Sequence, residues 1–197
     1  SNLAHINEIL ATALEVETNS FAKIQAIVDA VTKLEALADG TASTGVALTS
    51  AEFDQLGVNA NGLAASELTL INSLLDRRYL TEVDTPAELQ AAIDSVIKIM
   101  VIASGGSSTS ALTSQDMSAI GFSQVTDDHV MMVSVRIRES ADDGTGVDSY
   151  AELKAMVDAV LAEVAAASSL PLIVNFVETG GSSPLAIDYS LANVQVD

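Results

Sequence analysis

Three segments of the chain follow one pattern: residues 24–31 (IQAIVDAV), residues 89–96 (LQAAIDSV) and residues 153–160 (LKAMVDAV). Apolar positions recur in each at intervals of three and four, which is typical of a helix with one buried face. Their starting positions are almost evenly spaced along the chain. Residues 48–50 (LTS) return as residues 112–114 with nearly the same spacing. Separate matches that share one period indicate a tandem repeat.

Each repeat is expected to fold as three helices. A short first helix begins after Thr49, a residue that can cap it, and ends at Gly57, because glycine accepts the left-handed conformation of a helix end. The apolar spacing predicts a second helix over about 63–79. A third helix begins near Thr85, where Thr85 and Glu88 form a capping box.

Two segments allow more than one interpretation. Residues 133–138 (VSVRIR) alternate as a strand would, but they occupy the place of a second helix, and we predict a helix there. An apolar stretch over 170–181 holds Pro171, and either a strand or an extended linker fits it. After it, residues 187–194 resemble another first helix.

We therefore predict an all-α chain of tandem three-helix-bundle repeats of about 64 residues, joined by Gly/Ser-rich linkers. Placing boundaries in those linkers gives a partial repeat with the second and third helices over 1–40, complete repeats over 41–104 and 105–169, and a linker with a further first helix over 170–197. A permuted division, with each unit running second, third, first helix, stays open.

The composition excludes several functional classes. The chain has 197 residues, no Cys, 8 Lys+Arg and 27 Asp+Glu, so its formal net charge is −19. Without cysteine it has no disulfide, thiol nucleophile or Cys-ligated zinc. So few basic residues argue against nucleic acid, since phosphate binding requires clustered Lys and Arg. No stretch is apolar enough to predict direct membrane insertion.

Motifs of the middle repeat carry a family resemblance. They are residues 53–58 (FDQLGV), residues 70–72 (LIN), residues 88–89 (EL) and residues 92–94 (AID). In these motifs and their order the chain resembles the GA module, the three-helix albumin-binding module of bacterial surface proteins. The longer period and the acidic, Gly/Ser-jointed repeats are similar to those of large secreted adhesins of Gram-negative bacteria. The resemblance implies tandem, extracellular, non-enzymatic units.

The resemblance does not extend to the albumin contact. GA modules begin their second helix with aromatic and lysine side chains, whereas this chain has residues 65–69 (ASELT) and residues 129–133 (HVMMV) in that place. We therefore expect a spacer or stalk of an extracellular or cell-surface protein involved in cell adhesion. Its expected partners are neighbouring repeats of the same chain. A module that binds a host or matrix protein through one helix face is the alternative.

One loop is a candidate metal site. Asp142, Asp143 and Asp148 flank two glycines, and several carboxylates on a flexible loop are ligands that calcium prefers. The spacing is not that of an EF-hand, and acidic turns before a helix are also favoured by the helix dipole. The two histidines, His5 and His129, are too far apart for a zinc-protease motif. No catalytic residue and no cofactor other than calcium is predicted.

Two adjacent pairs of side chains have ordinary structural interpretations. Met131 and Met132 are expected to fill gaps in the core, although methionines also form adaptable binding surfaces. Arg77 and Arg78 are expected to pair with neighbouring acidic residues on the surface.

Overall fold

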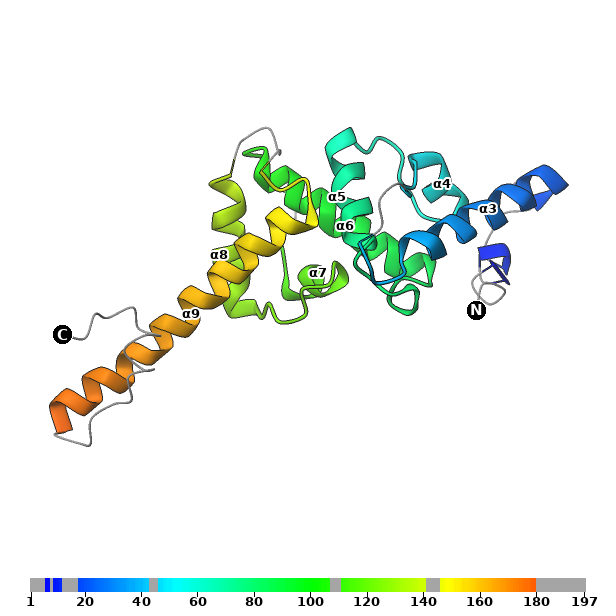
Figure 1. The fold of residues 1–197 in the computed structure, drawn as a ribbon. Coiled ribbons are helices and arrows are strands. Elements are labelled where there is room, and N and C mark those ends of the chain that lie inside the picture. Colours follow the sequence, from blue (N-terminus) through cyan, green and yellow to red (C-terminus); the bar gives the residue numbers. More distant parts are fainter. Residues whose placement is uncertain are drawn as a thin grey trace.

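The computed structural model describes residues 6–7, 9–11, 18–42, 46–106, 111–140 and 146–179. Within these ranges the chain is all-α, as predicted, and has no strand (Figure 1). The elements in chain order are α3 (Phe21–Leu37), α4 (Ser50–Gln55), α5 (Ala65–Leu75), the 3-10 helix η1 (Leu80–Glu82), α6 (Pro86–Ala103), α7 (Ser114–Ala119), α8 (Asp127–Arg138) and α9 (Tyr150–Thr179).

The predicted helix starts and stops are confirmed where the signals are local. Thr49, Thr85 and Thr113 are the N-caps of α4, α6 and α7, and each forms a capping box with the acidic residue three positions on. Gly57 follows α4 with φ +79°, and Gly121 follows α7 with φ +98°. These glycines end the short helices because other residues rarely adopt a positive φ.

The second helices are shorter or differently placed than the apolar pattern predicts. α5 ends at Leu75 instead of near Tyr79, and the chain continues into η1. The Tyr79 amide donates to the Glu82 carboxylate (2.9 Å), which starts this separate turn. Residues 133–138 are helical in α8, so the helix prediction there is correct.

The alternatives of a strand or an extended linker after residue 169 are wrong for the described part of that segment, because α9 continues to Thr179. Adding residues to an existing helix costs less than nucleating a new element, since only the first turn is entropically unfavourable. A short apolar run also cannot by itself distinguish strand from buried helix. The predicted further first helix, residues 187–194, lies outside the described residues.

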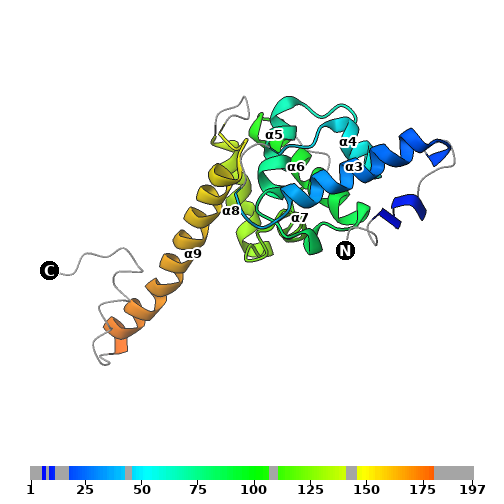
Figure 2. The same cartoon turned by 45° about the vertical axis from the view of Figure 1, so that its right-hand side comes forward.

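The buried apolar residues form one connected core from Ile9 to Val160. α6 lies at its centre and packs against α5, α7 and α8, while α3 packs on α4 and α8 on α9 (Figures 1 and 2). The core thus continues from α6 into α7 across the Gly/Ser segment between them. The division into tandem three-helix units stays a prediction, and so does the choice between boundaries in this segment and the permuted division.

The helices α5 and α8, at the place of the predicted second helices, do not keep the spacing that the other elements keep. The short helices α4 and α7 begin at Ser50 and Ser114, which keeps the repeat spacing. α5 and α8 begin at Ala65 and Asp127, which lie closer together, because the loop before α8 is shorter by two positions. As a result, α5 and α8 align so that half-buried Leu68 and buried Ile71 and Leu75 correspond to buried Val130, Val133 and Ile137.

Gly40 lets the chain after α3 approach the chain after α5 closely. Gly40 has φ +80°, its amide donates to the Arg78 carbonyl (2.9 Å), and a Cβ there would lie 2.3 Å from the Tyr79 ring. Gly62 has φ +84° but open space around it.

Gly40→Ala should therefore lower the free energy of unfolding by about 2–3 kcal/mol, and Gly62→Ala by about 1 kcal/mol for backbone strain alone.

Urea unfolding of both variants measures this difference. In a Tyr79→Ala background, which removes the ring, the cost of Gly40→Ala should fall to that of Gly62→Ala. Equal costs of the two glycine substitutions in the wild-type background would contradict the steric account.

Candidate functional site

The predicted calcium loop is only partly described. Asp142 and Asp143 lie outside the described residues, and Asp148 is half-buried just ahead of α9. Among the described residues no three His, Asp or Glu side chains gather closely enough to hold a metal ion. Calcium binding by this loop stays a prediction.

His129 has a structural contact at the start of α8. Its Nδ1 lies 3.2 Å from the Thr126 amide nitrogen, in the place where other helices use an acidic capping residue. His5 lies outside the described residues. The Nδ1 atom of His129 also lies 3.2 Å from the Thr126 hydroxyl oxygen, so His129 contacts both the amide and the side chain of the residue that precedes α8.

An open groove of about 800 Å³ lies between α6 and α7. It is lined by side chains of α6 and α7, with Arg78 and Glu82 at one end. Its charged residues carry both signs: Arg78, Glu82, Glu88, Asp94, Lys98 and Asp116. Carboxylates outnumber cations among them, but Arg78 and Lys98 each form an ion pair with one of these carboxylates.

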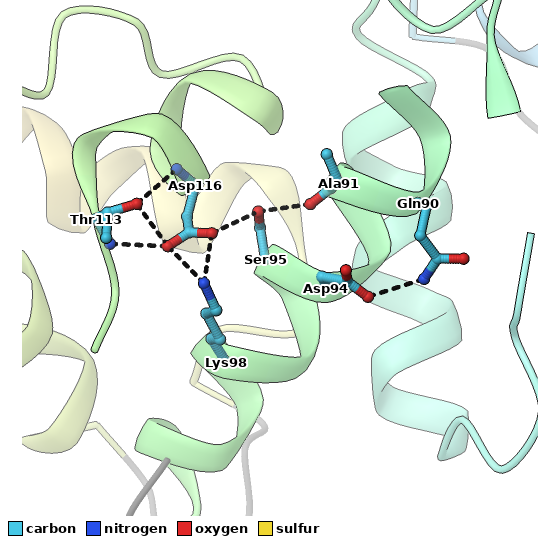
Figure 3. Close-up of polar contacts among 7 residues, drawn as sticks. All are labelled: Gln90, Ala91, Asp94, Ser95, Lys98, Thr113 and Asp116. Carbon is cyan, nitrogen blue, oxygen red and sulfur yellow. Dashed lines mark hydrogen bonds and ion pairs between the residues drawn. The ribbon is translucent and has the colours of Figure 1, made fainter. Parts of the chain in front are cut away.

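Lys98 and Asp116, which line the groove, belong to a hydrogen-bonded cluster (Figure 3). Lys98 of α6 donates to both carboxylate oxygens of Asp116, at 2.7 and 2.9 Å. The amide and hydroxyl of Thr113 donate to the same carboxylate at 2.8 and 2.7 Å. The Asp116 amide in turn donates to the Thr113 hydroxyl (3.1 Å). We call Lys98, Thr113 and Asp116 the α6–α7 clamp, because they join the long helix to the cap of the short one.

The same arrangement joins α3 to α4. Lys33 donates to both carboxylate oxygens of Glu52 at 2.8 and 2.9 Å. Thr49 donates to Glu52 through its amide and its hydroxyl, at 2.7 and 2.8 Å. We call this set the α3–α4 clamp. It is the more exposed of the two: its side chains are 34% and 30% accessible, against 22% and 13% for Lys98 and Asp116.

Both clamp carboxylates are held ionised. Burial alone would raise the pKa of Asp116, but the Lys98 ammonium and the Thr113 donors outweigh it and hold that pKa below the usual value. At Glu52, burial also raises the pKa, but hydrogen bonds from Lys33 and Thr49 outweigh it and lower the pKa below the usual value. A carboxylate that stays ionised and fully hydrogen-bonded is a poor general acid or base at neutral pH. The clamps are therefore suited to joining helices and not to proton transfer.

A second set of contacts ties the end of α5 to α7. Arg78 donates through Nη1 to the carbonyls of Ser118 and Ala119, at 3.3 and 3.2 Å. These are the last residues of α7, where unpaired carbonyls favour a cation. Its Nε is buried without a hydrogen bond, although Glu82 Oε2 lies within ion-pair distance at 3.3 Å. The prediction that Arg78 pairs with a neighbouring acid is thus confirmed, but its expected surface position is wrong, because the side chain is only 13% accessible.

The start of α9 docks on α5 through one aromatic residue. The Tyr150 amide donates to Ser73 Oγ (2.8 Å), and the Arg77 guanidinium lies 5.5 Å above the Tyr150 ring. The ring also stacks on Phe122, with centroids 5.6 Å apart. The docking therefore combines a hydrogen bond, a cation–π contact and aromatic stacking.

Sequence reasoning missed the clamp lysines and the aromatic docking residue, although a signal for the clamps exists. Lys33 and Lys98 occupy one position of the repeated pattern, and Glu52 and Asp116 occupy another. An oppositely charged pair that recurs at the repeat spacing predicts a recurring contact. The expected core position of Met131 is wrong, because its side chain is 74% exposed.

Comparisons with known proteins return no match. No protein-family model, no curated protein and no solved structure matches this chain. Among the described helices, none combines the length and apolar character that a membrane span requires.

Removing the α6–α7 lysine tests the clamp. Lys98→Met keeps most of the aliphatic stem but leaves the half-buried Asp116 carboxylate without its counter-charge, so we expect a loss of about 1–2 kcal/mol in the free energy of unfolding. Lys154→Met is the matched control, because its partner Asp158 is exposed, and it should cost about 0.5 kcal/mol or less. Equal losses in urea unfolding would contradict a special role for Lys98.

The lowered pKa values predict a loss of stability in acid. Because the folded state lowers the pKa of Asp116 and Glu52 below the ordinary 3.8 and 4.5, the unfolded chain takes up protons first as the pH falls. The stabilisation is complete above these ordinary values and is lost as the pH falls through the lower folded ones.

Urea unfolding between pH 7 and pH 3 measures this loss. The stability difference between wild type and Asp116→Asn should shrink toward acid pH. Asp94→Asn, at an exposed carboxylate of α6, controls for the removal of one negative charge. A wild-type advantage over Asp116→Asn that is undiminished between pH 7 and pH 3 would show that the carboxylate's charge does not matter.

Proposed function

We propose that this chain is part of a tandem array of three-helix units in a non-enzymatic, extracellular bacterial surface protein, and that the array acts as a spacer or stalk. The observation that supports it best is the recurrence of the clamp. Lys33–Glu52 and Lys98–Asp116 make the same contacts at positions one repeat period apart. A junction that recurs with one geometry gives an array a fixed rise per unit, as an extended spacer needs.

The charge of the chain supports the same proposal. A net charge of −19 keeps a long, crowded array soluble and discourages collapse of one unit onto another. The groove between α6 and α7 has charges of both signs, and its carboxylate Asp116 is already bound by Lys98. The alternative remains a protein-binding module, favoured by the exposed apolar side chains of Met131 and Val135 on α8.

Fusions of one, two and three copies of the chain test the spacer. Small-angle X-ray scattering should give a maximum dimension that grows by a constant increment for each copy. The same fusions carrying Lys33→Met and Lys98→Met should show a smaller increment, because both clamps are lost. A dimension that grows only as the cube root of the mass would contradict the proposal.

A binding assay on the single chain tests the alternative. Serum albumin and extracellular-matrix proteins are immobilised and the chain is passed over them. We expect no binding. Tight binding that Met131→Ser abolishes would instead favour the protein-binding module.

A further inference from the structure

Large exposed apolar side chains gather in two places. Among the described residues they are Phe21 (81% exposed), Ile24 (36%), Tyr79 (63%), Met131 (74%) and Val135 (46%). Tyr79 is accounted for, because it packs over Gly40. Phe21 and Ile24 lie at the start of α3, and Met131 and Val135 lie on α8. These two helices are on opposite sides of the helical body in both views (Figures 1 and 2).

The start of α3 corresponds to the start of α9. Phe21 and Tyr150 are each the first residue of their helix, three positions before the repeated segments 24–31 and 153–160. Ser20 caps α3 through the Lys23 amide, and Ser149 makes the same contact with the Glu152 amide. Leu153 is fully buried, whereas its counterpart Ile24 is partly exposed. Phe21 is therefore exposed at the position where Tyr150 packs against Phe122 and Arg77.

The exposed side of α8 corresponds to the α5 surface that receives Tyr150. In the alignment that matches the starts of the two helices, Ser73 of α5 corresponds to Val135, and Arg77 corresponds to Glu139. This side of α8 bears a shallow pocket of about 260 Å³, which we call the α8 face. Its lining residues are Met131, Met132, Val135, Arg136, Glu139 and Glu163. The flexible methionine side chains suit the reception of an aromatic ring.

The charges around the two ends are complementary. Where α5 presents Arg77 and α9 carries Glu152, the α8 face presents Glu139 and α3 carries Lys23. The charge on the receiving helix and the charge on the docking helix are thus both reversed. Glu139 and Glu163 both form ion pairs with Arg136, so the rim of the α8 face has two carboxylates for one guanidinium. The start of α3 would bring a cation toward this remaining negative charge.

We propose that the start of α3 in one copy of this chain docks on the α8 face of a second copy, with Phe21 in the place that Tyr150 takes on α5. The inference rests on the repeat register of the proposed array and goes beyond it by naming the contact between separate copies. Such a contact joins two different surfaces, so it produces head-to-tail chains or rings and not two-fold symmetric dimers.

Sedimentation equilibrium of the full chain tests the contact. In about 0.5 M NaCl, which screens the repulsion between copies, the average mass should rise continuously as the concentration goes from about 10 μM to about 1 mM. Phe21→Ser and Val135→Asp should each stay monomeric. Tyr79→Ser, at an exposed aromatic outside both surfaces, should associate like wild type.

Mixing the two defective variants gives the sharpest test. Phe21→Ser keeps an intact α8 face and Val135→Asp keeps an intact α3 start, so an equimolar mixture should form one-to-one heterodimers and nothing larger. Circular dichroism checks that both variants are folded, since both replace exposed residues. A wild-type chain that is monomeric at about 1 mM, or a mixture that does not pair, would overturn the proposal.

Sedimentation of the single chain tests the α3–α8 contact, whereas scattering of the fused copies tests the spacer, so the two proposals can fail independently. Phe21→Ser in a single chain leaves the clamps intact, and the scattering of covalently fused copies does not need association between separate molecules. Monomers in sedimentation together with a constant increment in scattering would reject the α3–α8 contact alone.

Discussion

The carboxylate at the third position of each short helix is the interaction on which the arrangement depends. A helix as short as α4 or α7 is not stable alone. Its acidic residue completes the cap, lies at the favourable end of the helix dipole and binds a lysine of the preceding long helix. The same carboxylate therefore serves both the cap of the short helix and its attachment to the long one, and its partners offset the cost of burying its charge.

Features fixed by neighbouring residues could be predicted from the sequence. The starts of α4, α6 and α7 follow from a threonine and an acid three positions on, and the ends of the short helices follow from Gly57 and Gly121. Both signals act within about one turn of helix, so no knowledge of the fold is needed. The all-α class follows in the same way from apolar spacing.

Features fixed by distant residues could not be predicted. α5 stops at Leu75 because Glu82 starts a separate turn and because the Tyr79 ring packs over Gly40. The shifted register of α8 depends on loop lengths, which a nearly constant repeat period conceals. The clamps needed a comparison of charges on two different helices, because neither member of the pair is unusual by itself.

The third copy of the long helix lacks the clamp lysine. Ala162 of α9 occupies the position of Lys33 and Lys98, and it is exposed. A carboxylate brought to this position would meet a methyl group instead of an ammonium, so α9 offers no counter-charge of the kind that Lys33 and Lys98 provide. In the proposed array, junctions with and without the ion pair would follow one another in a fixed order, and the stability of the junctions would vary along the array in the same order.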